Sequence, residues 1–260
     1  MDRRRLGRTS LDVPVIGMGT WQTFDTEQDR RPIVDEALQA GIDLFDSSPM
    51  YGRAEDLLAK ALDGRRGKAI VASKIWTSSE AEGRKQADHA LGLFGRVEVY
   101  QVHNLVAWKT QLRLLERLKD EGKVTAVGAT HYQPGAFDEL CDVMRTGRLD
   151  MIQLPYNPIL RDAERRALPL AAELGLGVLI HSPLRFGVLN REPDPDLLQE
   201  LGVKTWAQAV LKWIASDERV TCVLTATKTK GRPTENAVAG EPPWFTVDQR
   251  NILAREVNAA

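Results

Sequence analysis

Four side chains that could move a proton stand at or just beyond the ends of short apolar segments: Asp46, Tyr51, Lys74 and His103. A tyrosine has an ordinary pKa of about 10, which is too high for an efficient acid at neutral pH. A nearby lysine cation favours the phenolate and lowers that pKa, and a carboxylate beside the lysine holds its ammonium in place. A histidine can orient a substrate carbonyl group by hydrogen bonding. The set therefore predicts Tyr51 as a general acid, tuned by Lys74 and Asp46, with His103 orienting the substrate.

Taken one at a time, these residues also have purely structural interpretations. Asp46 could cap a helix or a turn, Tyr51 could be an interfacial aromatic residue, and His103 could be a buried histidine whose hydrogen bonds are satisfied. Lys74 is harder to explain in this way, because it closes the apolar segment AIVASK. Acid–base groups gathered at one mouth are typical of an active site, so the joint pattern favours function.

The segments that must position these residues alternate between strand-like and helix-like patterns. Short apolar runs, typical of strands covered on both faces, are followed by runs with helical periodicity. Strands are predicted at residues 15–19, 43–45, 69–73, 97–102, 124–128, 151–154, 177–180 and 221–224. Helices are predicted at residues 27–40, 54–62, 80–94, 112–121, 134–145, 163–173, 206–216 and 234–239. Eight such units in series predict an α/β protein with a single (β/α)8 TIM barrel, as one domain over residues 1–260.

The segments outside the barrel pattern are few. Residues 4–15 predict a β-hairpin with its turn at 7–10, placed to cap the bottom of the barrel. Residues 247–257 predict a final helix, and residues 183–196 form the only long irregular stretch.

Composition excludes several classes of partner. The chain has 260 residues, of which 43% are hydrophobic, and a net charge of -1 from 35 basic and 36 acidic residues. No domain-wide basic excess calls for nucleic acid or an anionic membrane. The basic N-terminal segment lacks the apolar stretch of a secretory signal, and no apolar run approaches the roughly 20 residues that cross a bilayer. We therefore expect a cytoplasmic protein, taken as a monomer, that acts on a small molecule.

The cysteines and histidines do not suggest a metal site. Cys141 and Cys222 are isolated and predict buried thiols. None of the four histidines forms an HExxH-type pair, so no metal is expected.

Six motifs resemble those of the aldo-keto reductases, in that family's order. The segment GIDLFDSSPMYG is similar to the family motif G-x-[ND]-x-[FI]-D-[TS]-x-x-x-Y-G, with Asp46 and Tyr51 at matching spacing. The opening RRLGRTSLDVPVIGMGTW resembles the family's hairpin and first strand. The remaining likenesses are GKVTAVGATHY, QLPYN, HSPL and VLTATKTKGRPTENAVA, so the resemblance runs from about residue 3 to residue 239.

The resemblance implies an oxidoreductase that reduces aldehydes or ketones to alcohols by hydride transfer from NADPH, with Tyr51 as the general acid. Thr130 and Gln153 fall where the family binds the nicotinamide carboxamide, and His131 stands at the adjoining asparagine position. His181 replaces the tyrosine that usually stacks on the nicotinamide. The other implied cofactor contacts are Gly19, Thr20, Trp21, Asp46, Ser182, Leu184, Thr227, Lys228, Arg232, Glu235 and Asn236.

The same resemblance bears on the choice between NADPH and NADH. Thr227, Lys228 and Arg232 fall at or beside the positions that grip the adenosine 2′-phosphate, and their side chains are the donors that a phosphate needs. The run KTKGR could also be a solvated loop, but within this motif it favours NADPH. Two residues depart from the family, because Thr225 and Ala226 replace its usual proline followed by glycine or lysine. The chain has no GxGxxG fingerprint, so a Rossmann mode of binding is not expected.

The predicted substrate pocket is apolar and aromatic. Its candidate residues, each of which could instead pack in the core, are Trp21, Met50, Trp76, His103, Trp108 and Phe186. A pocket of this kind suits aromatic or medium-chain aldehydes and ketones. The loops after the fourth and seventh strands are short for the family, which predicts an open and shallow pocket.

Two other functions remain open at this point. A Schiff-base aldolase would use Lys74, but that chemistry needs a lysine of lowered pKa, whereas Asp46 should keep Lys74 charged. A non-catalytic, redox-sensing accessory subunit could keep the same residues and bind NADPH without useful turnover.

Overall fold

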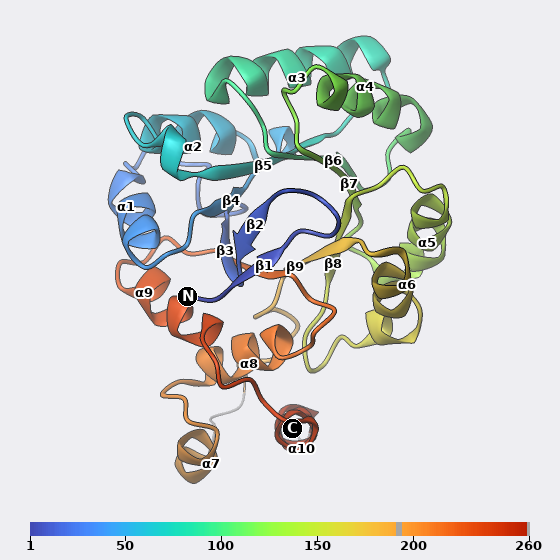
Figure 1. The fold of residues 1–260 in the computed structure, drawn as a ribbon. Coiled ribbons are helices and arrows are strands. Elements are labelled where there is room, and N and C mark those ends of the chain that lie inside the picture. The colour runs from blue at the N-terminus through green and yellow to red at the C-terminus, as the bar shows by residue number, and fades with distance from the viewer. Residues whose placement is uncertain (191–193, 259–260) are drawn as a thin grey trace.

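Eight parallel strands close into a barrel with helices around it (Figure 1). The strands follow one another around the barrel in chain order, and β10 pairs with both β9 and β3 to close it. They are β3 (Ile16–Gly19), β4 (Leu44–Asp46), β5 (Ile70–Ile75), β6 (Val99–His103), β7 (Ala126–Thr130), β8 (Met151–Pro155), β9 (Gly177–His181) and β10 (Cys222–Thr225). This computed structural model describes residues 1–190 and 194–258, and it confirms the predicted (β/α)8 TIM barrel.

The strands form two apolar layers because successive side chains point to opposite faces. The inner layer fills the barrel with one set of side chains: Leu44, Ala72, Val99, Ala126, Met151, Leu179, Cys222 and Leu224. The intervening residues, such as Phe45 and Val71, face outward and pack beneath the helices. Gly128 is required inside, because a Cβ there would lie 2.0 Å from the Met151 sulfur. The barrel interior is therefore a packed core rather than an open channel.

An antiparallel hairpin closes the N-terminal end of the barrel, as predicted. Its strands are β1 (Arg3–Arg5) and β2 (Asp12–Pro14). Leu6 and Val13 belong to the same buried cluster as the inner barrel residues, so they cover the bottom of the interior. Gly7 turns the chain at a φ of 56°, and a Cβ there would lie 2.6 Å from the Asp150 carbonyl oxygen.

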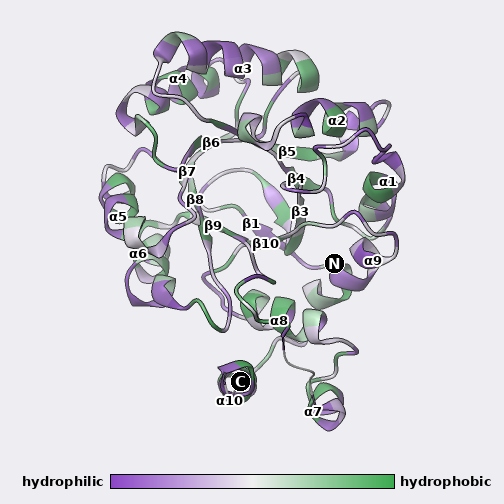
Figure 2. Ribbon diagram, turned by 180° about the vertical axis from the view of Figure 1, so that it is seen from behind, coloured by the Kyte–Doolittle hydropathy of each residue, from purple (hydrophilic) through white to green (hydrophobic). Residues whose placement is uncertain are grey.

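Most of the helices that follow the strands bury one face and leave the other to solvent, whereas the helix Trp206–Ala215 is buried along almost its whole length. Figure 2 shows hydrophobic and hydrophilic residues mixed along the ring of helices. These helices are α1 (Arg31–Gln39), α2 (Ala54–Ala61), α3 (Glu80–Phe94), α4 (Trp108–Asp120), α5 (Phe137–Arg145), α6 (Ala167–Leu174), α8 (Trp206–Ala215) and α9 (Arg232–Ala237). The final helix, α10 (Val247–Asn258), lies outside this ring, where it was predicted in the sequence.

Several helix boundaries differ from the sequence prediction, and one helix was not predicted. Helix α1 begins at Arg31 rather than at residue 27, because Pro32 lacks an amide hydrogen and fits only the first turn of a helix. Helix α4 begins four residues earlier than predicted, at Trp108. The short helix α7 (Pro195–Glu200) was not predicted, and it enters the stretch 183–196 that was expected to be irregular. Residues 191–193 of that stretch lie outside the described residues.

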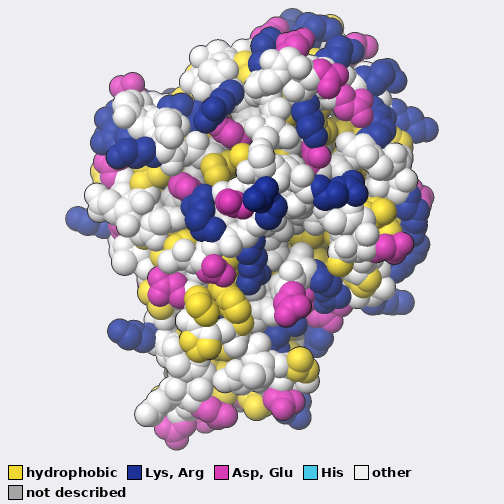
Figure 3. Space-filling view, viewed as in Figure 1, with side chains coloured by type: hydrophobic (Ala, Val, Ile, Leu, Met, Phe, Trp, Pro, Cys, Tyr) yellow, Lys and Arg dark blue, Asp and Glu magenta, His cyan; other side chains and the backbone are white. Residues whose placement is uncertain are grey.

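The surface carries charges of both signs. Lys and Arg side chains are interspersed with Asp and Glu over the face that bears the hairpin (Figure 3). Cys141 and Cys222 are both buried, as predicted. Among the residues that the structure describes, no helix has the length and apolar character needed to cross a membrane.

Candidate active site

The inward-facing positions of the strands change from apolar to polar toward the carboxyl end of the barrel. On β4, the inner residue Leu44 is followed two residues later by Asp46, and on β5 Ala72 is followed by Lys74. His103 also faces inward, because it lies an even number of residues beyond a position on β6 that fills the inner core. Because side chains alternate along a strand, all three enter the interior at its upper end.

These three side chains line a cavity with a volume of about 560 Å³. That volume falls in the usual range for small-molecule sites. The register of the barrel sets the order of the polar residues around it, since Lys74 lies opposite Gln101, His103 opposite Thr130, and Thr130 opposite Gln153.

Lys74 and Asp46 form a buried ion pair at the floor of the cavity. The Lys74 Nζ donates to Asp46 Oδ2 at 2.7 Å and to the Ser47 carbonyl oxygen at 2.8 Å, and both side chains are almost fully buried. Gln101 Nε2 donates to the other Asp46 oxygen at 3.2 Å. Burial opposes the charge of Lys74, but attraction to Asp46 and Tyr51 raises its pKa above the ordinary value. The ammonium is therefore fixed in position and stays charged.

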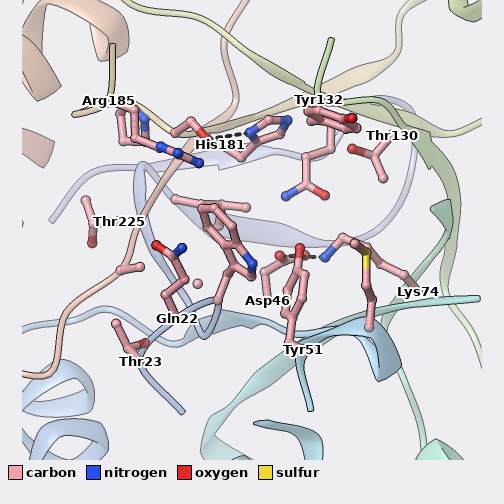
Figure 4. A pocket seen from close by; sticks show the side chains of 18 of the residues that line it. Gln22, Thr23, Asp46, Tyr51, Lys74, Thr130, Tyr132, His181, Arg185 and Thr225 are labelled. Carbon is pink, nitrogen blue, oxygen red and sulfur yellow. Dashed lines mark hydrogen bonds and ion pairs between the residues drawn. The ribbon is translucent and has the colours of Figure 1, made fainter. Parts of the chain in front are cut away.

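Tyr51 reaches the cavity from the turn that follows β4. The 3-10 turn Pro49–Tyr51 places its ring beside the ion pair, with the Lys74 Nζ 5.1 Å from the ring centroid (Figure 4). The ring meets the His103 imidazole edge-on, with 5.7 Å between the two centroids. The four residues that the sequence separates by up to 57 positions, 46 to 103, thus meet in one cavity.

The net shift of the Tyr51 pKa is the opposite of the one expected. Burial of the phenol raises its pKa above the ordinary value, and this outweighs the lowering by the Lys74 cation. The negative charge of Asp46 also raises it. The sequence indicated the lysine but not the depth of the phenol, which is a property of the tertiary structure. Tyr51 consequently holds its proton at neutral pH.

His103 is held neutral and oriented. Burial lowers its pKa to about 2, assisted by the Lys74 cation and by His181 and His131 nearby. Its Nδ1 lies 2.9 Å from the hydroxyl oxygen of Ser48. A neutral imidazole so placed can donate or accept one hydrogen bond in the cavity.

Backbone strain is concentrated at the same end of the barrel. Six described non-glycine residues have positive φ angles, and all lie in the loops after β3, β6 and β9: Gln22, Asn104, Leu105, Ala107, Ser182 and Phe186. Such conformations persist only where the surroundings enforce them, and they cluster at functional sites.

Most of the residues predicted around the nicotinamide line the cavity. Those that do are Gly19, Trp21, Asp46, Thr130, Gln153, His181, Ser182 and Leu184. Thr20 is fully buried behind the wall, where its hydroxyl donates to the Asp46 carbonyl oxygen at 3.1 Å. His131 stacks on Tyr132 beside the rim, with the ring centroids 5.4 Å apart. Thr225 and Ala226, the departures from the family motif, are part of the wall.

The residues predicted for the adenosine end lie beyond the cavity, in the loop after β10 and in α9. Arg232 pairs with Glu235 at 2.6 Å, Asn236 is buried, and Lys228 is exposed. The hydroxyl of Thr227 accepts a hydrogen bond from the Thr229 amide. This segment is tethered to α1 by a residue that the sequence did not reveal, since the Glu36 carboxylate accepts from the amides of residues 231 and 234.

Only some of the residues predicted to contact the substrate lie in the cavity wall. Trp21, Met50 and His103 line the cavity. Trp76, Trp108 and Phe186 are not among its lining residues, although Trp76 and Phe186 are exposed at the same end of the barrel. The three follow strand ends in the sequence, but the direction in which a loop carries a side chain is set by packing that the sequence does not display.

Arg185 and Tyr132 line the cavity but were not predicted. The Arg185 guanidinium lies 4.7 Å from the centroid of the Trp21 ring, so it bridges the loops after β9 and β3 (Figure 4). Both residues adjoin predicted ones, His131 and Leu184, and their place beside those motifs is the signal that could have found them.

One polar atom in the cavity wall has no partner. Gln153 is buried, and its Oε1 makes no hydrogen bond to the described residues. A buried amide oxygen without a donor is costly unless a ligand supplies one. The NH₂ group of a carboxamide would do so, so the wall fits a nicotinamide.

Comparison with known proteins agrees with this architecture. The model of the Aldo/keto reductase family matches residues 15–252. An NADH-specific methylglyoxal reductase from Escherichia coli is 27% identical over 233 residues, covering 73% of this chain and 69% of that protein. A probable voltage-gated potassium channel subunit beta from Oryza sativa is 26% identical, covering 92% of this chain and 91% of that protein.

Solved structures share the fold. An aldo/keto reductase from Klebsiella pneumoniae in complex with NADP and acetate superposes with a TM-score of 0.83 at 20% identity, covering 98% of this chain and 95% of that one. With a family model spanning nearly the whole length and a barrel that carries the expected polar residues at its mouth, the chain belongs to the aldo/keto reductase family.

Proposed function

We propose that the protein reduces aldehydes or ketones to alcohols with NADPH, and that Tyr51 is the proton donor. The observation that carries this proposal is the buried Lys74–Asp46 pair beside Tyr51 and His103 in one cavity. Membership in an oxidoreductase family supports it. The predicted cytoplasmic location and monomeric state stay predictions.

Each of the four residues has its own role in the proposed reduction. Tyr51 and His103 both line the cavity, so each could donate a hydrogen bond to the carbonyl oxygen of a substrate bound there. The bound nicotinamide supplies the hydride that adds to the carbonyl carbon. As negative charge grows on the oxygen, Tyr51 transfers its proton to it, and the Lys74 cation stabilises the phenolate that is left. Asp46 holds the Lys74 ammonium at the correct position throughout.

The cofactor would lie across the cavity with its carboxamide on Thr130 and Gln153 and its ring against His181. The unpartnered Oε1 of Gln153 supports the first of these contacts. The diphosphate of the cofactor would be bound by the part of the cavity wall that consists of Ser182, Leu184 and Arg185. The predicted adenosine contacts lie outside the cavity, in the loop after β10 and in α9.

We expect NADPH to be preferred over NADH because of Thr227, Lys228 and Arg232. Arg232→Leu should raise the Kd for NADPH about 10- to 100-fold, the usual weight of one charge-assisted hydrogen bond, and leave the Kd for NADH nearly unchanged. Fluorescence titration of both cofactors measures this. Lys230→Leu is the matched control, since it removes an exposed cation from the loop just before α9. Equal losses for the two cofactors, or tighter binding of NADH by the unaltered protein, would refute the assignment of NADPH.

The pH dependence of reduction follows from the pKa shifts of Tyr51 and His103. Protonated Tyr51 is the active acid, and its pKa lies above the ordinary value of 10.0, so activity should be lost only above pH 10. His103, with a pKa of about 2, should contribute no loss at neutral or mildly acidic pH. We therefore expect kcat/KM for an aldehyde without ionisable groups to be flat from about pH 7 to 9.5 at saturating NADPH. A decline centred below pH 9 would contradict this account.

A Schiff-base aldolase is disfavoured by the geometry. Imine formation needs an unprotonated amine, but the pKa of Lys74 is raised by Asp46 and Tyr51 despite its burial. Borohydride in the presence of a carbonyl substrate should leave the mass of the protein unchanged. A covalent adduct on Lys74 would favour the aldolase instead.

The non-catalytic alternative has one observation in its favour, the likeness to a potassium channel beta subunit. Oxidation of NADPH with a panel of aromatic aldehydes, diketones and sugars separates the two functions. We expect turnover with at least one class, because the four acid–base residues are complete. Tight binding of NADPH without turnover on any member of the panel would favour the accessory subunit.

A further inference from the structure

A buried serine lies behind the imidazole of His103. Ser48 follows β4, its side chain is fully buried, and its Oγ lies 2.9 Å from His103 Nδ1. The Met50 amide also donates to this Oγ, at 3.2 Å. These are the two hydrogen-bond partners of the Ser48 hydroxyl within the described part of the chain.

The hydrogen atoms can be counted to show which group donates. A serine hydroxyl has one hydrogen to donate and two lone pairs to accept with. If His103 Nδ1 carried a proton, the Ser48 oxygen would accept from both Nδ1 and Met50, and the hydroxyl hydrogen would have no acceptor. A buried donor left unsatisfied costs about 1–3 kcal/mol. If instead Ser48 donates to an unprotonated Nδ1, every one of these groups is satisfied.

We propose that Ser48 is a positioning residue that fixes His103 in the tautomer with its proton on Nε2. Nδ1 is occupied by the serine, so Nε2 is the ring nitrogen left for the cavity that His103 lines. Protonated Nε2 donates a hydrogen bond to a carbonyl oxygen, whereas the other tautomer would turn a lone pair toward that oxygen and repel it. This inference rests on the proposed carbonyl reduction for its consequence, although the tautomer itself does not depend on it.

The surroundings of the ring support a neutral imidazole. The charged and titratable groups that act on it are the Lys74 cation, His181 and His131, and the Tyr51 ring meets it edge-on. A second proton on His103 is opposed by burial and by Lys74. With the ring neutral, the position of its single proton decides whether it attracts or repels the substrate oxygen, and Ser48 is the group that selects that position.

The tautomer can be observed without substrate or cofactor. Long-range ¹H–¹⁵N correlation spectra of the ¹⁵N-histidine-labelled protein separate protonated from unprotonated ring nitrogens, and a His103→Asn spectrum assigns the signals. At pH 7 we expect an unprotonated Nδ1 and a protonated Nε2 on His103. Ser48→Ala should mix the two tautomers. A protonated Nδ1 in the unaltered protein, or an unchanged spectrum in Ser48→Ala, would overturn the proposal.

The catalytic consequence is measured separately. Ser48→Ala should lower kcat for aldehyde reduction about 10-fold, the weight of one buried hydrogen bond, and leave the Kd for NADPH unchanged. Ser73→Ala is the matched control, because it removes a buried hydroxyl that donates to Glu55 on the outer side of the barrel. It should lower stability but keep kcat and the His103 spectrum. If the spectrum is as expected but no variant turns over, carbonyl reduction is refuted and the tautomer assignment stands. If Ser48→Ala keeps its full kcat, Ser48 does not position His103 for catalysis.

Discussion

Tyr51→Phe should lower kcat for carbonyl reduction about 100- to 10,000-fold, the range that a general acid contributes. The phenyl ring keeps the packing against His103 and Lys74 but has no proton to transfer. The Lys74 cation would still stabilise charge on the substrate oxygen, so some activity should remain. Steady-state rates with a reactive aldehyde at saturating NADPH measure this effect, and fluorescence titration should show a nearly unchanged Kd for NADPH.

The matched control for this change is Tyr100→Phe. Tyr100 is a buried tyrosine on β6 that faces away from the cavity, where its hydroxyl donates weakly to the Gln86 carbonyl oxygen at 3.4 Å. This variant should keep kcat within about twofold, since the hydroxyl is remote from the cavity. If Tyr51→Phe retained more than a tenth of the activity, the proton would have to come from another group.

Lys74→Met should have the largest effect on stability, because it leaves the Asp46 carboxylate buried without its cation. Removing one partner of a buried ion pair costs about 3–5 kcal/mol in the free energy of unfolding. Gln101 Nε2, at 3.2 Å from Asp46, compensates only in part. Activity should fall as well, since no cation remains to stabilise the Tyr51 phenolate. Urea denaturation and steady-state kinetics measure the two effects.

The double variant Asp46→Asn/Lys74→Met separates stability from catalysis. It removes both buried charges, so we expect it to recover most of the lost free energy of unfolding. Its kcat should stay as low as that of Lys74→Met, because the Tyr51 phenolate still lacks its cation. Recovery of activity together with stability would show that the pair serves only the fold.

The sequence was sufficient to predict the barrel and the meeting of its four acid–base residues. Strand side chains alternate with a period of two, and the loops of a TIM barrel gather at one end, so residues at successive strand ends must converge. The spacing from Leu44 to Asp46 and from Ala72 to Lys74 contains this information. The residues of such a site are therefore predictable even where the exact strand boundaries are not.

Properties that depend on depth and loop direction could not be predicted in the same way. The direction of the net pKa shift at Tyr51 is set by burial, which raises the pKa by more than the Lys74 cation lowers it. The contact between Ser48 and His103 joins the turn after β4 to the end of β6, 55 residues further along the chain, and no periodicity indicates it. By contrast, the start of α7 could have been predicted from the sequence, since Asp194 caps a helix that begins with Pro195.

The central claim, hydride transfer from NADPH to a carbonyl carbon, is tested most directly by isotope transfer. The protein is incubated with an aldehyde and with each of the two NADPH isomers that carry deuterium at one face of C4, and the alcohol is examined by mass spectrometry. We predict that one isomer delivers a single deuterium to the carbonyl carbon, and that Tyr51→Phe slows this transfer to the same extent as kcat. Alcohol formed without deuterium from either isomer, or no alcohol with any aldehyde or ketone, would contradict the account.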